Sequence, residues 1–347
     1  MSTPAALTIP AGQVDERLTA VLADYGEQWG TLDPLFGETI DLLSTLVLSG
    51  GKRVRPAMAY WGHVAAGGNP TDGNVANLGA ALELLQAFAL FHDDVMDGSP
   101  TRRGAPTAHV RAISDHEANN WAGDARRYGE SVAILAGDVS LVLSDVLLAD
   151  VNADVRRLWN DLRVEVNLGQ FLDVVGTARG QVPLATAERI VEYKTARYTI
   201  VRPLQMGAAL AGRNDLEDAL GAIGTPLGIA FQLRDDMLGV FGESQVTGKP
   251  VGDDLREGKP TPLLARARES ATPDQLSLLD LIGSNLTSDQ IADIQMIFAD
   301  TGAVADIESQ IQTLTDESLD AIARTPLAQD AAEHLTELAL FLASRTS

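Results

Sequence analysis

Residues 78–97 read LGAALELLQAFALFHDDVMD and repeat apolar side chains with the 3.6-residue period of a helix. The Gly-Ser-Pro that follows predicts that this helix ends at Gly98. Gln86, Asp93 and Asp97 fall on one stripe of the helix, beside leucines and Phe88 or Ala89. A charged helix end that continues into an apolar wall favours an amphiphilic substrate.

The rest of the chain favours an all-α protein. The 347 residues are 45% hydrophobic but only 5% aromatic, and alternating β-branched runs are scarce. Further helical periods cover residues 131–150, 154–175, 187–211 and 215–240. Capping boxes that begin at Thr272 and Thr287 predict two more helices. No linker is long enough to divide the chain, so we expect one domain over residues 1–347, with residues 1–10 disordered.

Composition excludes several classes of function. The net charge of −22 argues against a nucleic-acid partner and against docking on an anionic membrane. Cysteine is absent, which excludes disulfides, thiolate catalysis and zinc–cysteine sites. The start, MSTPAALTIP, lacks the features of a signal peptide, and acidic residues interrupt every long apolar run. We therefore expect a soluble, cytoplasmic protein without a transmembrane segment.

The first aspartate cluster, Asp93-Asp94-Val95-Met96-Asp97, predicts a metal site. Asp93 and Asp97 are four residues apart, so their Cβ atoms lie about 5 to 6 Å from each other on a helix. At that distance two carboxylates repel by roughly 3 kcal/mol at an effective dielectric near 20, a penalty that a divalent cation reverses. Oxygen ligands with open positions suit Mg²⁺ shared with phosphate. The alternative is a solvated acidic helix end.

A second cluster, Asp235-Asp236, lies 142 residues further on (93 to 235). Basic residues follow both clusters: Arg102 and Arg103 after the first, Lys249 and Lys259 after the second. Together the clusters look like two metal clamps for one diphosphate.

Seven motifs then occur in a fixed order. They are Gly50-Gly51-Lys52-Arg53-Val54-Arg55-Pro56, Glu83-Leu84-Leu85-Gln86, His92 to Asp97 with Arg102-Arg103-Gly104, Gly169-Gln170-Phe171-Leu172-Asp173, Lys194-Thr195, Gln232 to Asp236, and Thr247-Gly248-Lys249 with Leu255 to Lys259. In order and spacing the chain resembles the trans-isoprenyl diphosphate synthases, also called the polyprenyl synthetase family, over about residues 45–265. In its detailed sequence the chain resembles the geranylgeranyl diphosphate synthase-like branch of actinobacteria.

The resemblance implies a bundle of about ten or more core helices around a central cavity, the isoprenoid synthase fold, and a homodimer. It also implies a prenyltransferase that joins isopentenyl diphosphate to allylic diphosphates (dimethylallyl, geranyl and farnesyl) with Mg²⁺, three ions per active site. The implied metal residues are Asp93, Asp94, Asp97, Asp235 and Asp236. The allylic diphosphate would contact Arg102, Lys194, Lys249 and Lys259.

The same resemblance assigns a separate isopentenyl diphosphate pocket to Lys52, Arg55, Gln86 and Arg103. Many relatives carry histidine where this chain has Gln86, which can donate a hydrogen bond but carries no charge. Lys194, Thr195 and Gln232 are the implied catalytic residues, the latter two with oxygens that face the carbocation.

Product length is expected to depend on Phe88 and Ala89, which the resemblance places at the floor of the elongation pocket. One aromatic and one small residue favour a C20 product, with C15 as its neighbour. A helical wheel separates Phe88 from Asp93 by about 140°, so this role rests on the resemblance.

Gly239 stands where many relatives have the last aspartate of the second motif. Asp253 and Asp254 could compensate, although we expect them to form a solvated acidic turn. Two alternatives stay open: a non-catalytic, regulatory subunit of a heteromeric synthase, for which Gly239 would mark decay, and a class I terpene cyclase.

Overall fold

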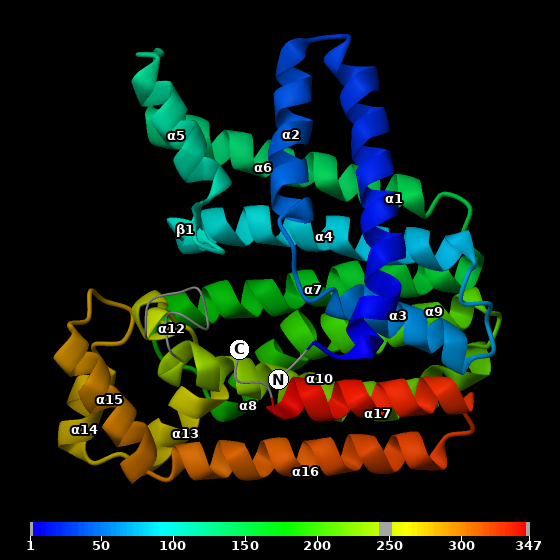
Figure 1. The fold of residues 1–347 in the computed structure, drawn as a ribbon. Coiled ribbons are helices and arrows are strands. Elements are labelled where there is room, and N and C mark those ends of the chain that lie inside the picture. Colours follow the sequence, from blue (N-terminus) through cyan, green and yellow to red (C-terminus); the bar gives the residue numbers. More distant parts are fainter. Residues whose placement is uncertain (1–2, 243–251, 345–347) are drawn as a thin grey trace.

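The computed structural model describes residues 3–242 and 252–344, and these are almost entirely helical (Figure 1). The prediction of an all-α fold is confirmed. The first part of the chain forms α1 (Ala5–Gly30), α2 (Pro34–Leu48), α3 (Val54–Ala65), α4 (Gly73–Asp97), α5 (Ala108–Ala118) and α6 (Ala125–Leu147). A short antiparallel pair, β1 (Thr101–Arg102) and β2 (Ala105–Pro106), follows α4.

The middle of the chain forms α7 (Ala153–Arg179), α8 (Leu184–Ile190), the π-helix η1 (Val191–Val201), α9 (Arg202–Leu210), the 3₁₀ turn η2 (Asn214–Leu216) and α10 (Glu217–Phe241). The last part forms α12 (Asp253–Glu257), α13 (Pro262–Ser270), α14 (Pro273–Leu279), α15 (Ser288–Asp300), α16 (Ala303–Arg324) and α17 (Gln329–Ser344). In Figure 1 the α1–α2 hairpin stands across α4 and α6, while α16 and α17 run side by side below α10.

Local sequence explains how α4 begins and ends. The carboxylate of Asp72 caps its first turn by accepting from the Asn74 backbone N–H at 2.9 Å. Gly98 closes the helix in the left-handed region, at φ 64°, where glycine carries no steric penalty. The predicted helix end is confirmed, and so are the capping boxes at Thr272 and Thr287.

The N-terminus differs from its prediction. Helix α1 begins at Ala5, and Ala6, Leu7 and Pro10 are buried. The indole N–H of Trp61 donates to the carbonyl of Ala6 at 2.7 Å, which fixes this first turn against α3. The expected disorder is therefore wrong for residues 5–10, because apolar contacts hold a segment whose position alone suggested fraying.

Residues 187–211 form α8, η1 and α9 instead of one regular helix. Two glycines let neighbouring helices approach η1 closely. A β-carbon on Gly169 of α7 would lie 2.6 Å from Cα of Lys194, and one on Gly228 of α10 would lie 2.6 Å from Cα of Ala196. The wider π turns thus occur where η1 lies between two helices, at the segment that carries Lys194 and Thr195.

Helix α4 is the central helix of one apolar cluster, which also contains buried side chains of α1, α2, α6 and α7. Helix α10 joins two further clusters, one with α3, α9 and α17 and one with α13, α15 and α16. By length and hydropathy α4 is the one described helix that could cross a membrane, but 61% of its apolar window is buried. This burial identifies α4 as a core helix of the bundle. The helices packed around α4 fix the position of its charged C-terminal end.

Candidate functional site

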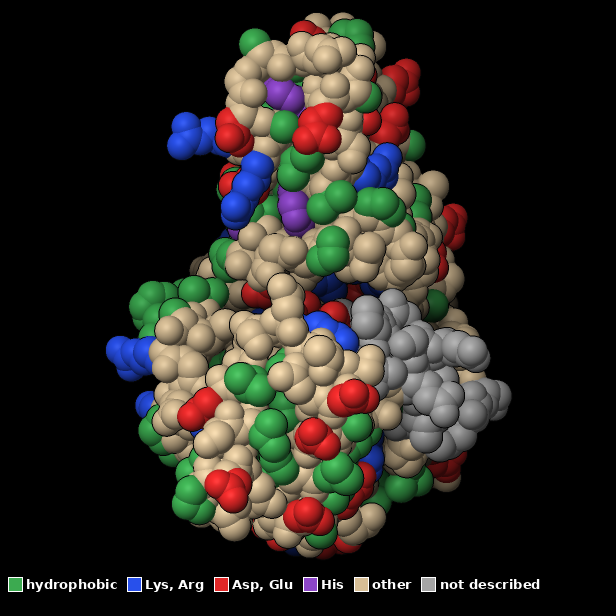
Figure 2. Space-filling view, turned by 90° about the vertical axis from the view of Figure 1, so that its left-hand side faces the viewer, with side chains coloured by type: hydrophobic (Ala, Val, Ile, Leu, Met, Phe, Trp, Pro, Cys, Tyr) green, Lys and Arg blue, Asp and Glu red, His purple; other side chains and the backbone are tan. Residues whose placement is uncertain are grey.

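The two aspartate clusters line one cavity of about 500 Å³. This cavity lies where the end of α4 meets η1, α10 and the segment from α12 to α13. Among the predicted residues it contains Lys52, Asp93, Asp97, Arg102, Lys194, Thr195, Gln232, Asp235, Asp236 and Lys259. Acidic and basic side chains meet in the hollow between the upper and lower halves of the molecule in Figure 2. Lys249 lies outside the described residues.

Asp93 contacts three polar or basic side chains at the cavity wall. It accepts from Gln170 Nε2 at 2.9 Å and from Lys194 Nζ at 3.3 Å, and Arg102 Nη2 lies 3.6 Å away. Burial alone would raise its pKa, but Lys194 and Arg102 lower the pKa below its ordinary value. Asp93 is therefore ionised and oriented before any ligand binds.

Asp97 lies one turn further and has the opposite electrostatics. Burial and the nearby charge of Asp93 raise its pKa to about 6. Below about pH 6, Asp97, the last acid of the motif, thus binds a proton that a cation would have to displace.

Asp94 does not line the cavity. Its buried carboxylate accepts from Arg102 Nε at 2.7 Å and so fixes the arginine that does line it.

The second cluster holds a carboxylate oxygen that lacks a partner. Asp236 Oδ1 accepts from Gln232 Nε2 at 2.6 Å, but Asp236 Oδ2 is buried without a hydrogen bond. Burial raises the pKa of Asp236 well above its ordinary value. Such an unpaired oxygen, on a residue that lines a cavity with other carboxylates, fits a hard divalent cation. Among the described residues no three acidic or histidine side chains converge on one point, so ligand oxygens would have to complete each coordination sphere.

Gly239 and Asp254 lie against each other. A β-carbon on Gly239 would overlap the carboxylate of Asp254, which lines the cavity and has a side chain only 15% exposed. The expectation that Asp254 belongs to a solvated acidic turn is therefore wrong. An acidic side chain from α12 thus lies beside position 239, where the sequence itself has no carboxylate.

Two lysines of the cavity, Lys194 and Lys259, contact acidic partners. Lys194 pairs with Asp173 and Asp93, which together raise its pKa although burial alone would lower it. Lys259 Nζ lies 3.0 Å from Asp254 and 2.7 Å from Glu257. Both lysines remain charged, and these ion pairs hold them at the cavity wall.

The predicted catalytic side chains form a short chain of hydrogen bonds. Thr195 Oγ1 donates to Gln232 Oε1 at 2.6 Å, and Gln232 in turn donates to Asp236. This chain orders η1 against α10 and leaves two polar groups at the wall of the cavity.

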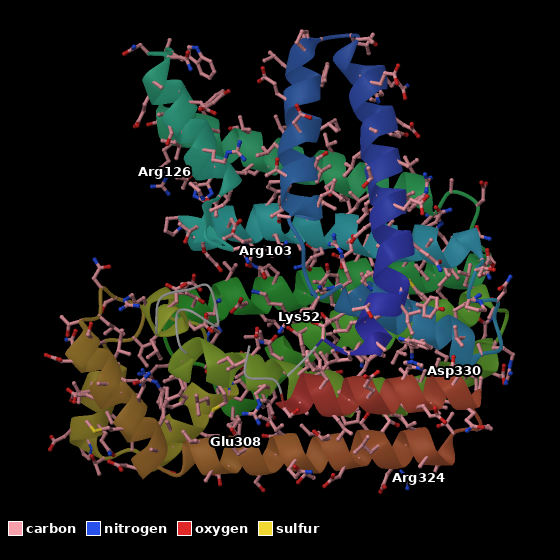
Figure 3. The ribbon with its side chains drawn as sticks, in the orientation of Figure 1. Lys52, Arg103, Arg126, Glu308, Arg324 and Asp330 are labelled. Atoms are coloured by element: carbon pink, nitrogen blue, oxygen red, sulfur yellow. The ribbon has the colours of Figure 1, made fainter. Side chains whose placement is uncertain are left out.

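The four residues predicted for a second diphosphate are split between two places. Lys52 lines the first cavity, and Arg103 donates to Ser49 Oγ at 3.2 Å and to the carbonyl of Gly50, so both lie near the segment before α3 (Figure 3). Arg55 and Gln86 instead line a second cavity of about 160 Å³.

Comparisons with known proteins show the family of this chain. The family model described as "Polyprenyl synthetase" matches residues 38–300, more than half of the chain. The chain belongs to the polyprenyl synthetase family. A geranylfarnesyl diphosphate synthase of Aeropyrum pernix is 31% identical over 320 residues, which are 89% of this chain and 93% of that protein. A (2E,6E)-farnesyl diphosphate synthase of Mycobacterium tuberculosis is 32% identical, over 85% of this chain and 80% of that one.

Among solved structures, the geranylgeranyl pyrophosphate synthase of Corynebacterium glutamicum, complexed with isoprenyl diphosphate and magnesium, superposes with a TM-score of 0.93. It is 38% identical and the match covers 99% of this chain and 100% of that chain. The protein is thus a short-chain trans-prenyl diphosphate synthase, a prenyltransferase, and its relatives differ in product.

The second cavity of this polyprenyl synthetase continues from the first. Asp93, Lys194 and Thr195 line both cavities, so the two meet at these residues. Phe88 and Ala89 line the second cavity as well, although the helical wheel had separated Phe88 from Asp93. A charged compartment thus opens into one with a largely apolar lining.

Sequence reasoning missed Tyr198. Its hydroxyl donates to Gln86 Oε1 at 2.8 Å, its ring lies 4.3 Å from the Arg55 guanidinium, and burial raises its pKa to about 12. The signal available was its spacing of four residues after Lys194. Two residues with no assigned role also contact site residues: Asp173 pairs with Lys194, and Gln170 donates to Asp93.

Proposed function

We propose that this synthase condenses isopentenyl diphosphate with an allylic diphosphate and releases mainly geranylgeranyl diphosphate (C20), with farnesyl diphosphate (C15) as the neighbouring product. The observation that carries the proposal is the junction of the two cavities at Asp93, Lys194 and Thr195. A diphosphate fits among the charges of the first cavity, and its prenyl chain fits along Phe88 and Ala89 in the second.

The metal ligands proposed are Asp93 and Asp97 on one side and Asp235 and Asp236 on the other, for three Mg²⁺ ions. Bound Mg²⁺ would neutralise the charge that develops on the leaving diphosphate. The partnerless oxygen of Asp236 and the raised pKa of Asp97 support these assignments. Arg102, Lys194 and Lys259, with Lys249, are proposed to bind the same diphosphate, each described cation exchanging a carboxylate contact for a phosphate oxygen.

Thr195 and Gln232 are proposed to stabilise the allylic carbocation through the dipoles of their side chains. Their hydrogen-bonded chain to Asp236 fixes these dipoles in advance, which is the condition under which electrostatic stabilisation is effective. Neither group is a strong nucleophile, so the cation is not trapped.

Isopentenyl diphosphate is proposed to bind Lys52, Arg55, Gln86 and Arg103. Two observations support this assignment: Lys52 lines the first cavity, and the Nε–H of Arg55 is buried without a hydrogen-bond partner. An arginine with an unused donor suits a phosphate oxygen.

The proposed activity is tested with the purified chain alone. Isopentenyl diphosphate, MgCl₂ and each allylic starter are supplied, and products are identified by mass. Formation of C20 and C15 diphosphates is expected. No turnover by the chain alone would instead favour the regulatory subunit, and a cyclic hydrocarbon from the allylic substrate alone would favour the terpene cyclase.

We further propose that the synthase is a soluble, cytoplasmic, single-domain homodimer. Large apolar side chains are exposed along α6 and α7: Ile134, Leu135, Val142, Val146, Val164, Leu168, Phe171 and Val174. Burying them would remove on the order of 400 Å² of apolar surface from water, at the size where a patch marks an interface. A second copy of this surface is the partner that supplies matching apolar groups.

A further inference from the structure

Two rings on α4 lie together at the wall of the second cavity. Phe88 and His92 both line it, and their ring centroids are 4.6 Å apart at an interplanar angle of 56°. We propose that His92 is a positioning residue that holds the Phe88 ring in place as the end wall of the product cavity, and so sets product length. This inference rests on the proposed synthase activity.

His92 is held on α6 by three contacts. Its Nε2 lies 3.1 Å from the carbonyl oxygen of Ile134 and 3.5 Å from Asp138 Oδ1. Its ring also lies close to Gly137, since a β-carbon there would be 2.5 Å from His92 Cδ2. Any side chain at position 137 would push the ring away from α6. The imidazole is thus fixed between two helices.

Phe88 lies one turn before His92, at the i, i+4 spacing that brings side chains into contact on a helix. Its ring is only half buried and packs against the apolar cluster around α4, so neighbouring side chains decide whether it can move. His92 occupies the space on the α6 side of that ring. A growing prenyl chain that presses on Phe88 therefore meets two rings and the α6 backbone, and not one rotatable side chain.

The contacts predict opposite effects for substitutions on the two sides of His92. His92→Ala removes the support, so Phe88 can move aside, and products longer than the main wild-type product should increase at least fivefold as a fraction of the total. Gly137→Ala pushes the imidazole toward Phe88 and the cavity, so the distribution should move to shorter products. Gly12→Ala adds a methyl that meets nothing within 4 Å and serves as the matched glycine control.

A double variant separates positioning from a direct effect. Phe88→Ala should lengthen products by itself, and His92→Ala with Phe88→Ala should give the distribution of Phe88→Ala alone, because His92 acts through the ring that is already absent. A longer distribution for the double variant would overturn the positioning role.

Should His92→Ala not fold, Asp138→Ala releases one contact of the imidazole from an exposed position, with a smaller shift in the same direction expected. All variants are assayed by product mass beside the wild type. An active His92→Ala or Asp138→Ala enzyme with the wild-type distribution, or a Gly137→Ala enzyme whose products do not shorten, overturns the inference and leaves the synthase activity intact. The proposed function itself fails only if the wild type makes no prenyl product.

Discussion

The carboxylate of Asp254 lies in the space that a side chain on Gly239 would fill. The glycine at position 239 therefore leaves room for a carboxylate from another helix. The cavity keeps its acidic wall, with Asp235 and Asp236 on α10 and Asp254 on α12.

This relationship predicts that Asp254→Asn lowers kcat about 100-fold, the scale of removing one preorganised electrostatic group. Gly239→Ala should also lower kcat, because its methyl group displaces the Asp254 carboxylate. Steady-state kinetics at several MgCl₂ concentrations measure both effects. Asp289→Asn, at an exposed position on α15, is the control. Full activity of Asp254→Asn would remove this carboxylate from the site.

Magnesium binding should depend on pH through Asp97. Its pKa of about 6 means that the carboxyl group is protonated below pH 6 in the metal-free enzyme and ionised above it. A cation must displace that proton, so the contribution of Asp97 should lower the affinity for Mg²⁺ with a diphosphate ligand by about tenfold per pH unit below 6, and should not change it above. Calorimetry between pH 5 and 8 measures this slope.

The matching variant is Asp97→Asn, which should bind Mg²⁺ more weakly at pH 8 and show a shallower slope. The slope does not vanish, because the raised pKa of Asp236 contributes to it. A wild-type affinity that stays constant from pH 5 to 7 contradicts the assignment of Asp97.

Arg53 should stabilise the fold and take no part in phosphate binding. It is buried, 5% exposed, and its guanidinium contacts Glu83 at 2.5 Å, Asp15 at 2.7 Å and the carbonyl of Val47 at 2.8 Å. Arg53→Ala leaves Glu83 buried without its partner, so the free energy of unfolding should fall by about 3 to 5 kcal/mol. Urea denaturation measures this change, and Arg126→Ala, in an exposed ion pair, should alter it little. An unchanged midpoint for Arg53→Ala would show that Glu83 finds another partner.

The exposed faces of α6 and α7 should hold two copies together. Phe171→Glu and Val164→Glu place charges where side chains are 66% and 71% exposed in the single chain. Sedimentation should show a dimer for the wild type and a monomer for the variants, since a buried unpaired carboxylate opposes association. Leu32→Glu, at the exposed tip between α1 and α2, should remain dimeric. A monomeric wild type rules out this interface.

The sequence was sufficient for the elements whose signals are local. The apolar period and the Gly98 stop gave α4, and capping boxes gave the starts of α14 and α15. The motifs also identified most of the side chains that line the first cavity.

The remaining features of the fold and the site could not be predicted from the sequence, because they depend on contacts between distant segments. The π turns of η1 lie where Gly169 of α7 and Gly228 of α10 approach it closely, and Asp254 occupies the space beside Gly239. These three glycines carry no chemistry themselves. The sequence alone could not show which residues of the basic run from Lys52 to Arg55 face the cavity and which are structural. Tertiary packing decides this, because it buries Arg53 beside Glu83 and leaves Lys52 at the cavity. The helical wheel placed Phe88 and Asp93 on different faces of α4, yet both line the second cavity. A helical wheel gives only the direction of each side chain from the helix axis and not how far the side chain extends.

Helix α4 carries both the aspartates at its C-terminal end and the aromatic wall one to two turns earlier. The proposed metal site and the proposed end of the product cavity are therefore spaced along one helix, at about 5.4 Å per turn. Evolution can exchange a bulky residue for a small one on this helix, and move the stop by a turn, without disturbing the carboxylates. A lineage of such enzymes can diversify its isoprenoids through point substitutions while the reaction itself stays under constant selection.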